Sequence, residues 1–362
     1  MDEPELWVAL RDVPGLHAAA ALSLVERFGS PSGVFRARRR DLPESCQRDL
    51  AAALARGPQL DAAREELNRA ARLGIRVLGQ DAPEYPRRLL EIPGPPLVLY
   101  AVGAAFSEPS VAMVGSRRPS ARGRETARGL AAAAASAGVA VVSGLAYGLD
   151  AAAHAGALAA SGATFAVLAS GLDRPSPHGN RGLARRIIDG GGGWISEYPP
   201  GTPALAHHFP VRNRLISGLA RLVVIVEARE RSGSLWTSTH AANQGRDVAA
   251  VPGPVDTDLC RGSNRLLRDG AIPILDAEDL LDELFPGRAR ESRPASVEPL
   301  TSREGRRVVE VLREGPAEAD GIARRLGLSA AALAEVLLEL ELAGHVIRQG
   351  SRIALSASVD RR

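Results

Sequence analysis

Seven short apolar runs between residues 77 and 287 constrain the fold of this 362-residue chain more than any other feature. Segments with helical spacing separate the runs. Apolar strands that alternate with helices are typical of a parallel sheet covered on both faces. The sequence therefore predicts an α/β fold with an extended Rossmann-like, doubly wound and mostly parallel sheet. The runs are VAMVG (111–115), VAVVSG (139–144), TFAVLASG (164–171), GWISEYPPG (193–201), LVVIVEA (222–228), DVAAVPG (247–253) and AIPIL (271–275).

The segments on either side of this region differ in composition. Residues 1–76 are rich in Ala, Leu and Arg, with one helix ending at Gly29, so we expect a small helical domain of the SAM or helix-hairpin-helix kind. Residues 288–300 are charged and contain proline, which is typical of a linker. Residues 301–362 contain three helical segments and then two strand-like ones, the order of a winged helix. The predicted core domain is residues 77–287.

The third helical segment of the expected winged helix argues against reading bases in a duplex. It carries Glu335, Glu339 and Glu341 and no arginine, whereas attraction to phosphate is the usual source of affinity for DNA. Whether this domain contacts DNA or a protein stays open.

Arginine supplies every basic side chain outside histidine, since the sequence contains no lysine. The net charge of +3 is too small to identify a partner by itself. Guanidinium groups are the better bidentate partners of phosphate. Two cysteines, Cys46 and Cys260, support neither a disulfide framework nor a metal site. We expect a cytoplasmic protein without a metal.

No membrane segment is expected. The opening residues MDEPELWVAL lack the basic and apolar order of a signal peptide. The uncharged stretch from Leu130 to Leu149 is mostly Ala, Gly, Ser and Val, and its pattern changes midway from helical to strand-like.

Glycine and small hydroxyl residues follow the predicted strands. In an open parallel sheet, ligands bind outside the carboxyl ends of the strands. Small residues let a ligand approach closely, and their N–H groups and hydroxyls suit an anion, above all where a helix begins. We predict a phosphate site that includes Gly115, Ser116, Arg117, Ser143, Gly144, Ser170, Gly171, Ser232, Gly233 and Ser234.

Neither standard nucleotide fingerprint is present. The stretch GSRRPSARG after the first run lacks the G-x-G-x-x-G spacing, and a G-x-x-x-x-G-K-[ST] loop needs a lysine. We therefore expect no cofactor. Basic and aromatic residues beside the predicted site favour a polyanion and a stacked base instead. They are Arg117, Arg118, Phe209, Arg212, Asn213 and Arg214.

Three groups of residues invite a catalytic interpretation. Asp150 and His154 lie one helical turn apart and Ser143 precedes them, but nothing in the spacing brings the serine to the histidine, and Asp150 is expected to cap its helix. His207 and His208 have no partner ligands at metal spacing.

Glu197 and Glu227 form the third group. They follow what we expect to be neighbouring strands, where they could act as a carboxylate pair in nucleotide hydrolysis or could bond loop N–H groups.

Taken in order, these motifs resemble the DNA-processing protein A family, DprA or Smf. The resemblance covers roughly residues 80–285, and helical and winged-helix accessory domains are found in many family members. The segments that carry it are VAMVGSRRPSARG, VVSGLAYGLDAAAHAGAL, AVLASGLDRPSPHGN, SEYPPGTP, FPVRNRLISGL, VVIVEARERSGSLWTSTHAANQGRDVAAVPG and GSNRLLRDGA.

The resemblance implies a protein that binds single-stranded DNA, usually as a homodimer, protects incoming strands and loads the RecA recombinase during natural transformation, with no catalytic activity. Tyr147 stands where the family commonly has arginine, which removes a charge or supplies a stacking surface. By matching motif, Ser116 and Arg117 would hold phosphate, and Phe209 would stack on a base. The same pocket would be lined by Arg212, Asn213 and Arg214 and closed by Ser232, Gly233, Ser234 and Thr237.

Two other function classes stay open. One is a nucleotide-monophosphate hydrolase similar to the cytokinin-activating phosphoribohydrolases, whose Pro-Gly-Gly-x-Gly-Thr loop is not matched by RSGSLWTS. The other is a transcription regulator acting through the winged helix. Candidates for a dimer surface, which the sheet's own core also needs, are Leu266, Leu267, Ile272 and Ile274.

Overall fold

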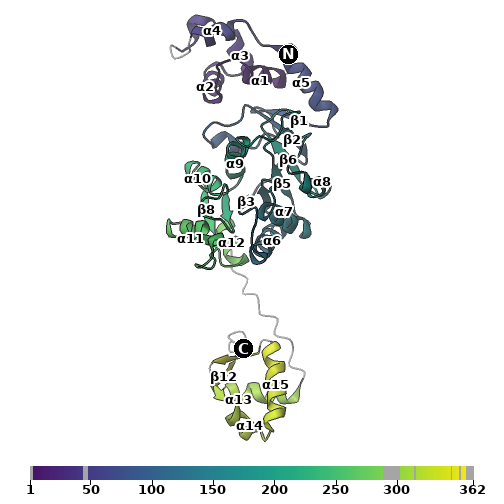
Figure 1. Ribbon diagram of the computed structural model, residues 1–362, viewed down its shortest axis with the longest axis vertical. Coiled ribbons are helices and arrows are strands. Elements are labelled where there is room, and N and C mark those ends of the chain that lie inside the picture. Colours follow the sequence, from purple (N-terminus) through teal and green to yellow (C-terminus); the bar gives the residue numbers. More distant parts are fainter. Residues whose placement is uncertain are drawn as a thin grey trace. The chain divides into compact units, whose positions relative to one another are not determined.

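The computed structural model describes residues 3–43, 48–287, 302–313, 315–343, 345–349 and 352–355. The chain forms two compact units, Met1–Arg288 and Ala289–Arg362. In Figure 1 the first unit carries the labels from α1 to α12 and the second those from α13 to β12. Cys46 and the expected linker at 288–300 lie outside the described residues.

A nine-stranded sheet forms the centre of the first unit, in the order β1-β2-β6-β5-β4-β3-β7-β8-β9. Neighbouring strands from β6 to β9 are parallel, whereas β2 runs antiparallel to β1 and to β6. The predicted doubly wound, mostly parallel sheet is confirmed. The strands are β1 (Arg76–Gly79), β2 (Val98–Gly103), β3 (Ser110–Val114), β4 (Ala140–Ser143), β5 (Thr164–Val167), β6 (Gly193–Ser196), β7 (Leu222–Ile225), β8 (Asp247–Ala250) and β9 (Ile272–Pro273).

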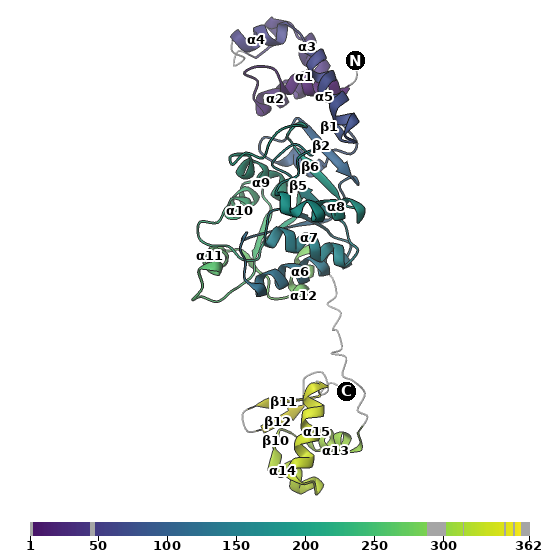
Figure 2. The same ribbon diagram turned by 45° about the vertical axis from the view of Figure 1, so that its right-hand side comes forward.

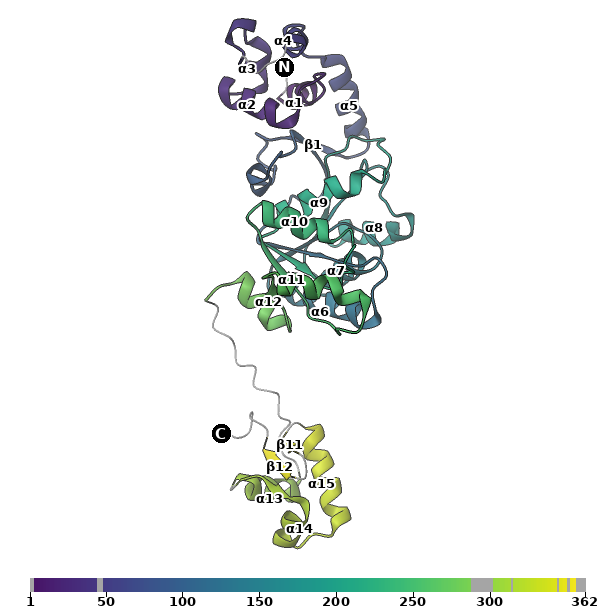
Figure 3. The ribbon, with the colours of Figure 1, turned by 60° about the vertical axis from the view of Figure 1, so that its left-hand side comes forward.

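Helices cover both faces of this sheet. Because successive side chains of a strand point to opposite faces, Val111 and Met113 of β3 pack in one core while Ala112 and Val114 pack in another. Figures 2 and 3 show α9 beside α10 and α6 beside α7. The first core contains residues of α6 (Ala121–Ser136), α7 (Leu149–Ala159) and α12 (Ala277–Leu284), and the second contains residues of α9 (His208–Leu219), α10 (Leu235–Asn243) and α11 (Arg261–Arg268).

The amino-terminal residues form helices that pack beside strands β1 and β2. Trp7 donates through Nε1 to Asp81 at 2.5 Å, and Arg11 donates to Glu66 at 2.9 and 3.1 Å and to the hydroxyl of Tyr100. These bonds tie the helices to the edge of the sheet. The helices are α1 (Glu3–Arg11), α2 (Ala18–Phe28), α3 (Pro31–Arg36), α4 (Arg48–Ala55) and α5 (Leu60–Arg72), while α8 (Arg181–Asp189) packs in the same core.

The chain reverses its direction across the sheet between β6 and β7. Strands β3, β4, β5 and β6 follow one another outward, and α9 then carries the chain back to the other side of β3, where β7 pairs with it. The connections from β3 and β7 lead in opposite directions, which leaves a crevice at their carboxyl ends. The expectation that Glu197 and Glu227 follow neighbouring strands is wrong, because β5, β4 and β3 lie between β6 and β7.

The residues considered for a dimer surface serve the first unit's own core. Leu266, Leu267 and Ile272 are partly buried and pack against core clusters, and Ile274 is buried. Their exposed area is therefore small.

Among the described residues, no helix has the length and the apolar composition needed to cross a membrane. The stretch from Leu130 to Leu149 comprises the end of α6, strand β4 and the first residue of α7, in agreement with its change of pattern.

The second unit has the element order of a winged helix, as predicted. Its core contains Val308, Leu312, Ile322, Leu333 and Leu337. A three-stranded sheet in the order β10-β12-β11 completes it. The elements are α13 (Arg303–Arg313), β10 (Ala317–Glu318), α14 (Ala319–Leu326), α15 (Ala330–Leu342), β11 (Val346–Gln349) and β12 (Arg352–Leu355).

Candidate functional site

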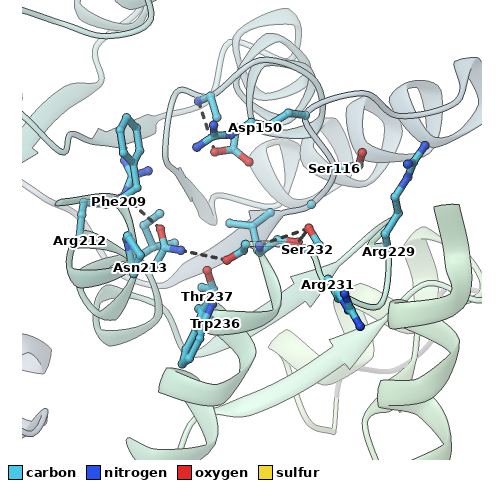
Figure 4. A pocket seen from close by; sticks show the side chains of 18 of the residues that line it. Ser116, Asp150, Phe209, Arg212, Asn213, Arg229, Arg231, Ser232, Trp236 and Thr237 are labelled. Carbon is cyan, nitrogen blue, oxygen red and sulfur yellow. Dashed lines mark hydrogen bonds between the residues drawn. The ribbon is translucent and has the colours of Figure 1, made fainter. Parts of the chain in front are cut away.

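A pocket of about 700 Å³ lies at the carboxyl ends of β3 and β7. This is the crevice where connections diverge and where open α/β sheets bind their ligands. Figure 4 shows Phe209, Arg212 and Asn213 on one side of this pocket and Ser116 and Arg229 on the other. The loop after β3, the first turns of α9, and the segment from the end of β7 to the start of α10 supply Gly115, Ser116, Arg117, Arg118, Phe209, Arg212, Asn213, Arg229, Arg231, Ser232, Gly233, Ser234, Trp236 and Thr237.

Four exposed arginines line this pocket: Arg117, Arg118, Arg229 and Arg231. None of their guanidinium groups forms an ion pair within the part of the chain that the structure describes. Four cations without ion-pair partners in the described chain, gathered around one pocket, produce a positive potential that suits an anion with several charges. We call this group the arginine rim.

Close backbone approach shapes the floor of the pocket. A Cβ atom on Gly115 would lie 2.3 Å from Cδ1 of Leu149 and 2.7 Å from the carbonyl oxygen of Glu227, so glycine is required there. The next amide, of Ser116, donates to that carbonyl at 2.8 Å. The hydroxyl of Ser116 accepts from the amide of Arg118 at 3.1 Å and so fixes the turn that presents two arginines.

The start of α10 offers polar groups to the pocket. Ser234 is the N-cap residue, and its side chain accepts no capping hydrogen bond. Its hydroxyl lies 2.7 Å from that of Ser232. The hydroxyl of Thr237 is buried and has no hydrogen-bond partner among the described residues. Because a buried polar group without a partner is costly, this hydroxyl suits a ligand oxygen.

Arg212 supports the pocket from beneath. It is 3% exposed and donates to the carbonyl oxygen of Gly144 at 3.0 Å and to that of Val167. Asp150 accepts from the amides of Gly144 at 3.1 Å and Ala146 at 3.3 Å. Burial lowers the pKa of Arg212 to about 10, although the Asp150 carboxylate raises it. Burial also raises the pKa of Asp150.

Phe209 contacts two guanidinium groups. The guanidinium carbons of Arg117 and Arg212 lie 5.2 and 5.9 Å from its ring centroid. These are cation–π distances. The ring predicted to stack on a base therefore also holds Arg117 in place.

Five of the predicted binding residues do not line the pocket. The hydroxyl of Ser143 donates to the carbonyl oxygen of Met113 at 2.6 Å, and that of Ser170 donates to the carbonyl oxygen of Arg174 at 2.9 Å. Arg214 forms an ion pair with Glu197. Their polar groups are engaged inside the first unit. The five are Ser143, Gly144, Ser170, Gly171 and Arg214.

The side chains of Ser143, Asp150 and His154, which were considered for catalysis, have hydrogen-bond partners other than one another. Nδ1 of His154 lies 2.7 Å from Oγ1 of Thr164, and burial lowers the pKa of His154 to about 3. Ser143 bonds a backbone oxygen, so the two do not form a nucleophile and base pair. Asp150 does not occupy the N-cap position, which belongs to Gly148.

Neither carboxylate of the third group is free for acid–base work. Glu197 pairs with Arg214, and Glu227 accepts from the amide of Ser120 at 2.9 Å and from its hydroxyl at 2.5 Å. The described residues contain no cluster of three or more potential metal ligands.

Among the lining residues that sequence reasoning missed are two cations, Arg229 and Arg231, and one aromatic residue, Trp236. Arg229 and Arg231 lie in the loop after β7, as Arg117 and Arg118 lie in the loop after β3. Since β3 and β7 are neighbours, this shared position after a strand was the available signal. Trp236 gave no signal, because a position on a helix does not by itself tell whether an aromatic residue is buried or exposed.

Known proteins share this architecture. The family model described as DNA recombination-mediator protein A matches residues 76–285, and that described as the DprA winged helix domain matches residues 291–351. A DNA processing protein DprA of Mycobacterium tuberculosis is 37% identical over 359 residues, which cover 93% of this chain and 90% of the relative.

Two solved structures are similar to the fold of this chain. That of DNA processing protein A from Streptococcus pneumoniae has a TM-score of 0.68 and 31% identity, and the match covers 78% of this chain and 99% of that one. The structure of DNA processing protein A from Helicobacter pylori describes a unique single-stranded DNA binding mode. It has a TM-score of 0.53 and 28% identity, and the match covers 58% of this chain and 95% of that one. The chain therefore belongs to the DNA recombination-mediator protein A family, DprA.

Proposed function

We propose that the first unit binds single-stranded DNA in the pocket between β3 and β7 and holds the strand without cleaving it. The observation that carries this proposal is the arginine rim, four exposed guanidinium groups without internal ion-pair partners around one pocket. Unpaired guanidinium groups that track a phosphate backbone are the usual basis of single-strand binding. The single-stranded DNA binding mode of the Helicobacter pylori relative supports the same ligand.

The shape of the site favours an unpaired strand over a duplex. The cations surround a pocket of about 700 Å³ that can receive a nucleotide turned out of the backbone, whereas a duplex keeps its bases stacked inside. Helix α15 of the second unit exposes Glu335 and Glu339, which repel a phosphate backbone.

The proposed role includes no catalysis. The carboxylates of Glu197 and Glu227 have partners within the protein, and His154 faces Thr164. In this proposal the protein acts as a homodimer, protects incoming single strands and loads RecA on them during recombination in natural transformation. A RecA ATPase assay on single-stranded DNA tests the last step, and equal rates with and without the protein would argue against loading.

The main test is a titration of single-stranded and duplex oligonucleotides of equal length across salt concentrations. We expect preference for the single strand and, for about four phosphates at about 0.7 each, a slope of log affinity against log salt near −3. Preference for duplex, a flat salt dependence or oligonucleotides returned shortened would contradict the proposal.

Two further assays separate the alternatives. Release of free base from a nucleoside monophosphate would support a phosphoribohydrolase. Deletion of residues 290–362 removes the second unit, and we expect single-strand binding to remain because the pocket lies wholly in the first. Loss of all DNA binding would favour a regulator that acts through the winged helix.

A further inference from the structure

Trp236 is an exposed aromatic residue at the border of the pocket. It is the second residue of α10, and 57% of its surface is exposed. Figure 4 shows it beyond Thr237, on the side away from Asp150. The other two tryptophans differ, since Trp7 and Trp194 donate through Nε1 to Asp81 at 2.5 Å and to the carbonyl oxygen of Ala184 at 3.0 Å. The indole of Trp236 therefore presents a large apolar area to solvent, which a ligand can cover.

The two aromatic side chains that line the pocket, Phe209 and Trp236, differ in their contacts. The ring of Phe209 already contacts the guanidinium groups of Arg117 and Arg212. Trp236 contacts no aromatic ring or guanidinium group among the described residues. An aromatic face that the chain itself leaves open, next to the arginine rim, has the chemistry of a platform for a nucleobase.

We propose that Trp236 stacks on a base of the strand where it leaves the pocket, while the arginine rim holds the neighbouring phosphates. This inference rests on the proposed single-strand binding. It adds a second aromatic contact to the bases beside the one expected of Phe209. Base–aromatic stacking strengthens binding by about 5- to 150-fold per base and accepts every base, since each has a π face. The site would therefore distinguish DNA that carries bases from a bare sugar–phosphate chain.

Two oligonucleotides of equal length test this proposal, oligothymidylate and a strand of abasic residues with the same phosphates. The full-length protein should bind oligothymidylate about 5- to 150-fold more tightly than the abasic strand. Trp236→Ala should lower that ratio several-fold while leaving affinity for the abasic strand and the salt slope unchanged. Trp236→Phe should keep an intermediate ratio, because a smaller ring remains. Thermal melts of each variant establish that it folds.

Leu275→Ala is the control. Leu275 is also a large apolar residue with 73% of its surface exposed, and it does not line the pocket. Its replacement should leave the ratio between the two strands as in the wild type. Indole fluorescence gives a second readout, since quenching on binding oligothymidylate should disappear in Trp236→Phe.

The outcomes are distinguishable. If Trp236→Ala keeps the wild-type ratio, or if Leu275→Ala lowers it equally, the stacking role of Trp236 is overturned. If Trp236→Ala changes the native mass of the protein and weakens both strands equally, the indole belongs to an interface between copies of the chain and the proposal also fails. If the wild type binds neither strand, the proposed function itself is wrong.

Discussion

Glu227 at the end of β7 accepts two hydrogen bonds from Ser120, one from its amide at 2.9 Å and one from its hydroxyl at 2.5 Å. Ser120 is the N-cap residue of α6, and its hydroxyl in turn accepts from the amide of Gly123. A Cβ atom on Gly123 would lie 2.3 Å from Cδ of Glu227, so the carboxylate fits closely over the start of the helix. Glu227, which the sequence suggested as one of a carboxylate pair for hydrolysis, therefore joins the loop after β7 to the start of α6.

We predict that Glu227→Ala lowers the free energy of unfolding by about 2 kcal/mol, because the amide of Ser120 loses its acceptor and the start of α6 loses a negative charge. Urea denaturation measures this. Glu125→Ala, an exposed carboxylate on the same helix, is the control and should change stability little. A Glu227→Ala variant as stable as the wild type would contradict this role.

Arg117→Ala should weaken binding to every single strand tested and reduce the steepness of the salt slope from about −3 to about −2. The variant removes one cation of the arginine rim and one guanidinium group from the ring of Phe209. Arg186→Ala, on the exposed surface of α8 away from the pocket lining, is the control. Mobility-shift titrations at several salt concentrations measure both. Equal slopes for the two variants would count against the site.

Thr237→Val should lower single-strand affinity about 5-fold, the effect of one hydrogen bond worth about 1 kcal/mol. Its melting temperature should not fall, because the hydroxyl lacks a partner in the described protein and valine has the same shape. Thr239→Val on the same helix is the control, since its hydroxyl is exposed and donates to the carbonyl oxygen of Leu235. Unchanged affinity in Thr237→Val would mean that no ligand oxygen meets this hydroxyl.

Arg214→Met should destabilise the protein by about 3 kcal/mol, because it leaves the Glu197 carboxylate buried without its cation. Burial already raises the pKa of Glu197, and Arg214 opposes that effect. Adding Glu197→Gln should restore most of the stability. The salt slope of single-strand binding should remain near −3, whereas a less steep slope would show that Arg214 also contacts a phosphate.

Protonation of His154 should lower the free energy of unfolding as the pH falls below 6.5. Its pKa is about 3 in the folded chain against 6.5 as the ordinary value, because burial disfavours the charged ring. Stability is therefore fully present above pH 6.5 and is lost as the pH falls toward 3, by at most about 1.4 kcal/mol per pH unit. Urea denaturation at pH 7 and pH 5 should show a larger loss for the wild type than for His154→Leu. The exposed His178→Gln variant should follow the wild type.

The sheet was largely predictable because its strands are short apolar runs between helices, as in Val111–Val114 of β3. Strands β1 and β2 were missed. β1 begins with the charged Arg76, and both strands pair antiparallel near the edge of the sheet, without the crossover helix that separates parallel strands in the sequence. The relation between β6 and β7 was also wrong, since the order of strands in a sheet is set by the crossover and not by the order along the chain.

The site was predictable in part, since loops after parallel strands meet at one edge. Sequence could not tell which hydroxyls and cations face the pocket. Ser143 and Ser170 turn to backbone oxygens, and Arg214 turns to Glu197, whereas Arg229 and Arg231 stay exposed at the pocket. The partners of Ser143 and Arg214 lie 30 and 17 residues away along the chain, which no local pattern records.

The arginine rim has a consequence for how the protein can be regulated. Acetylation, the common way for a cell to erase a positive charge, acts on lysine amines, and the sequence contains none. Guanidinium groups also keep their proton at every physiological pH. Lysine acetylation therefore cannot weaken anion binding at this pocket, and a modification that did so would have to act on its arginines or on the hydroxyl residues between them.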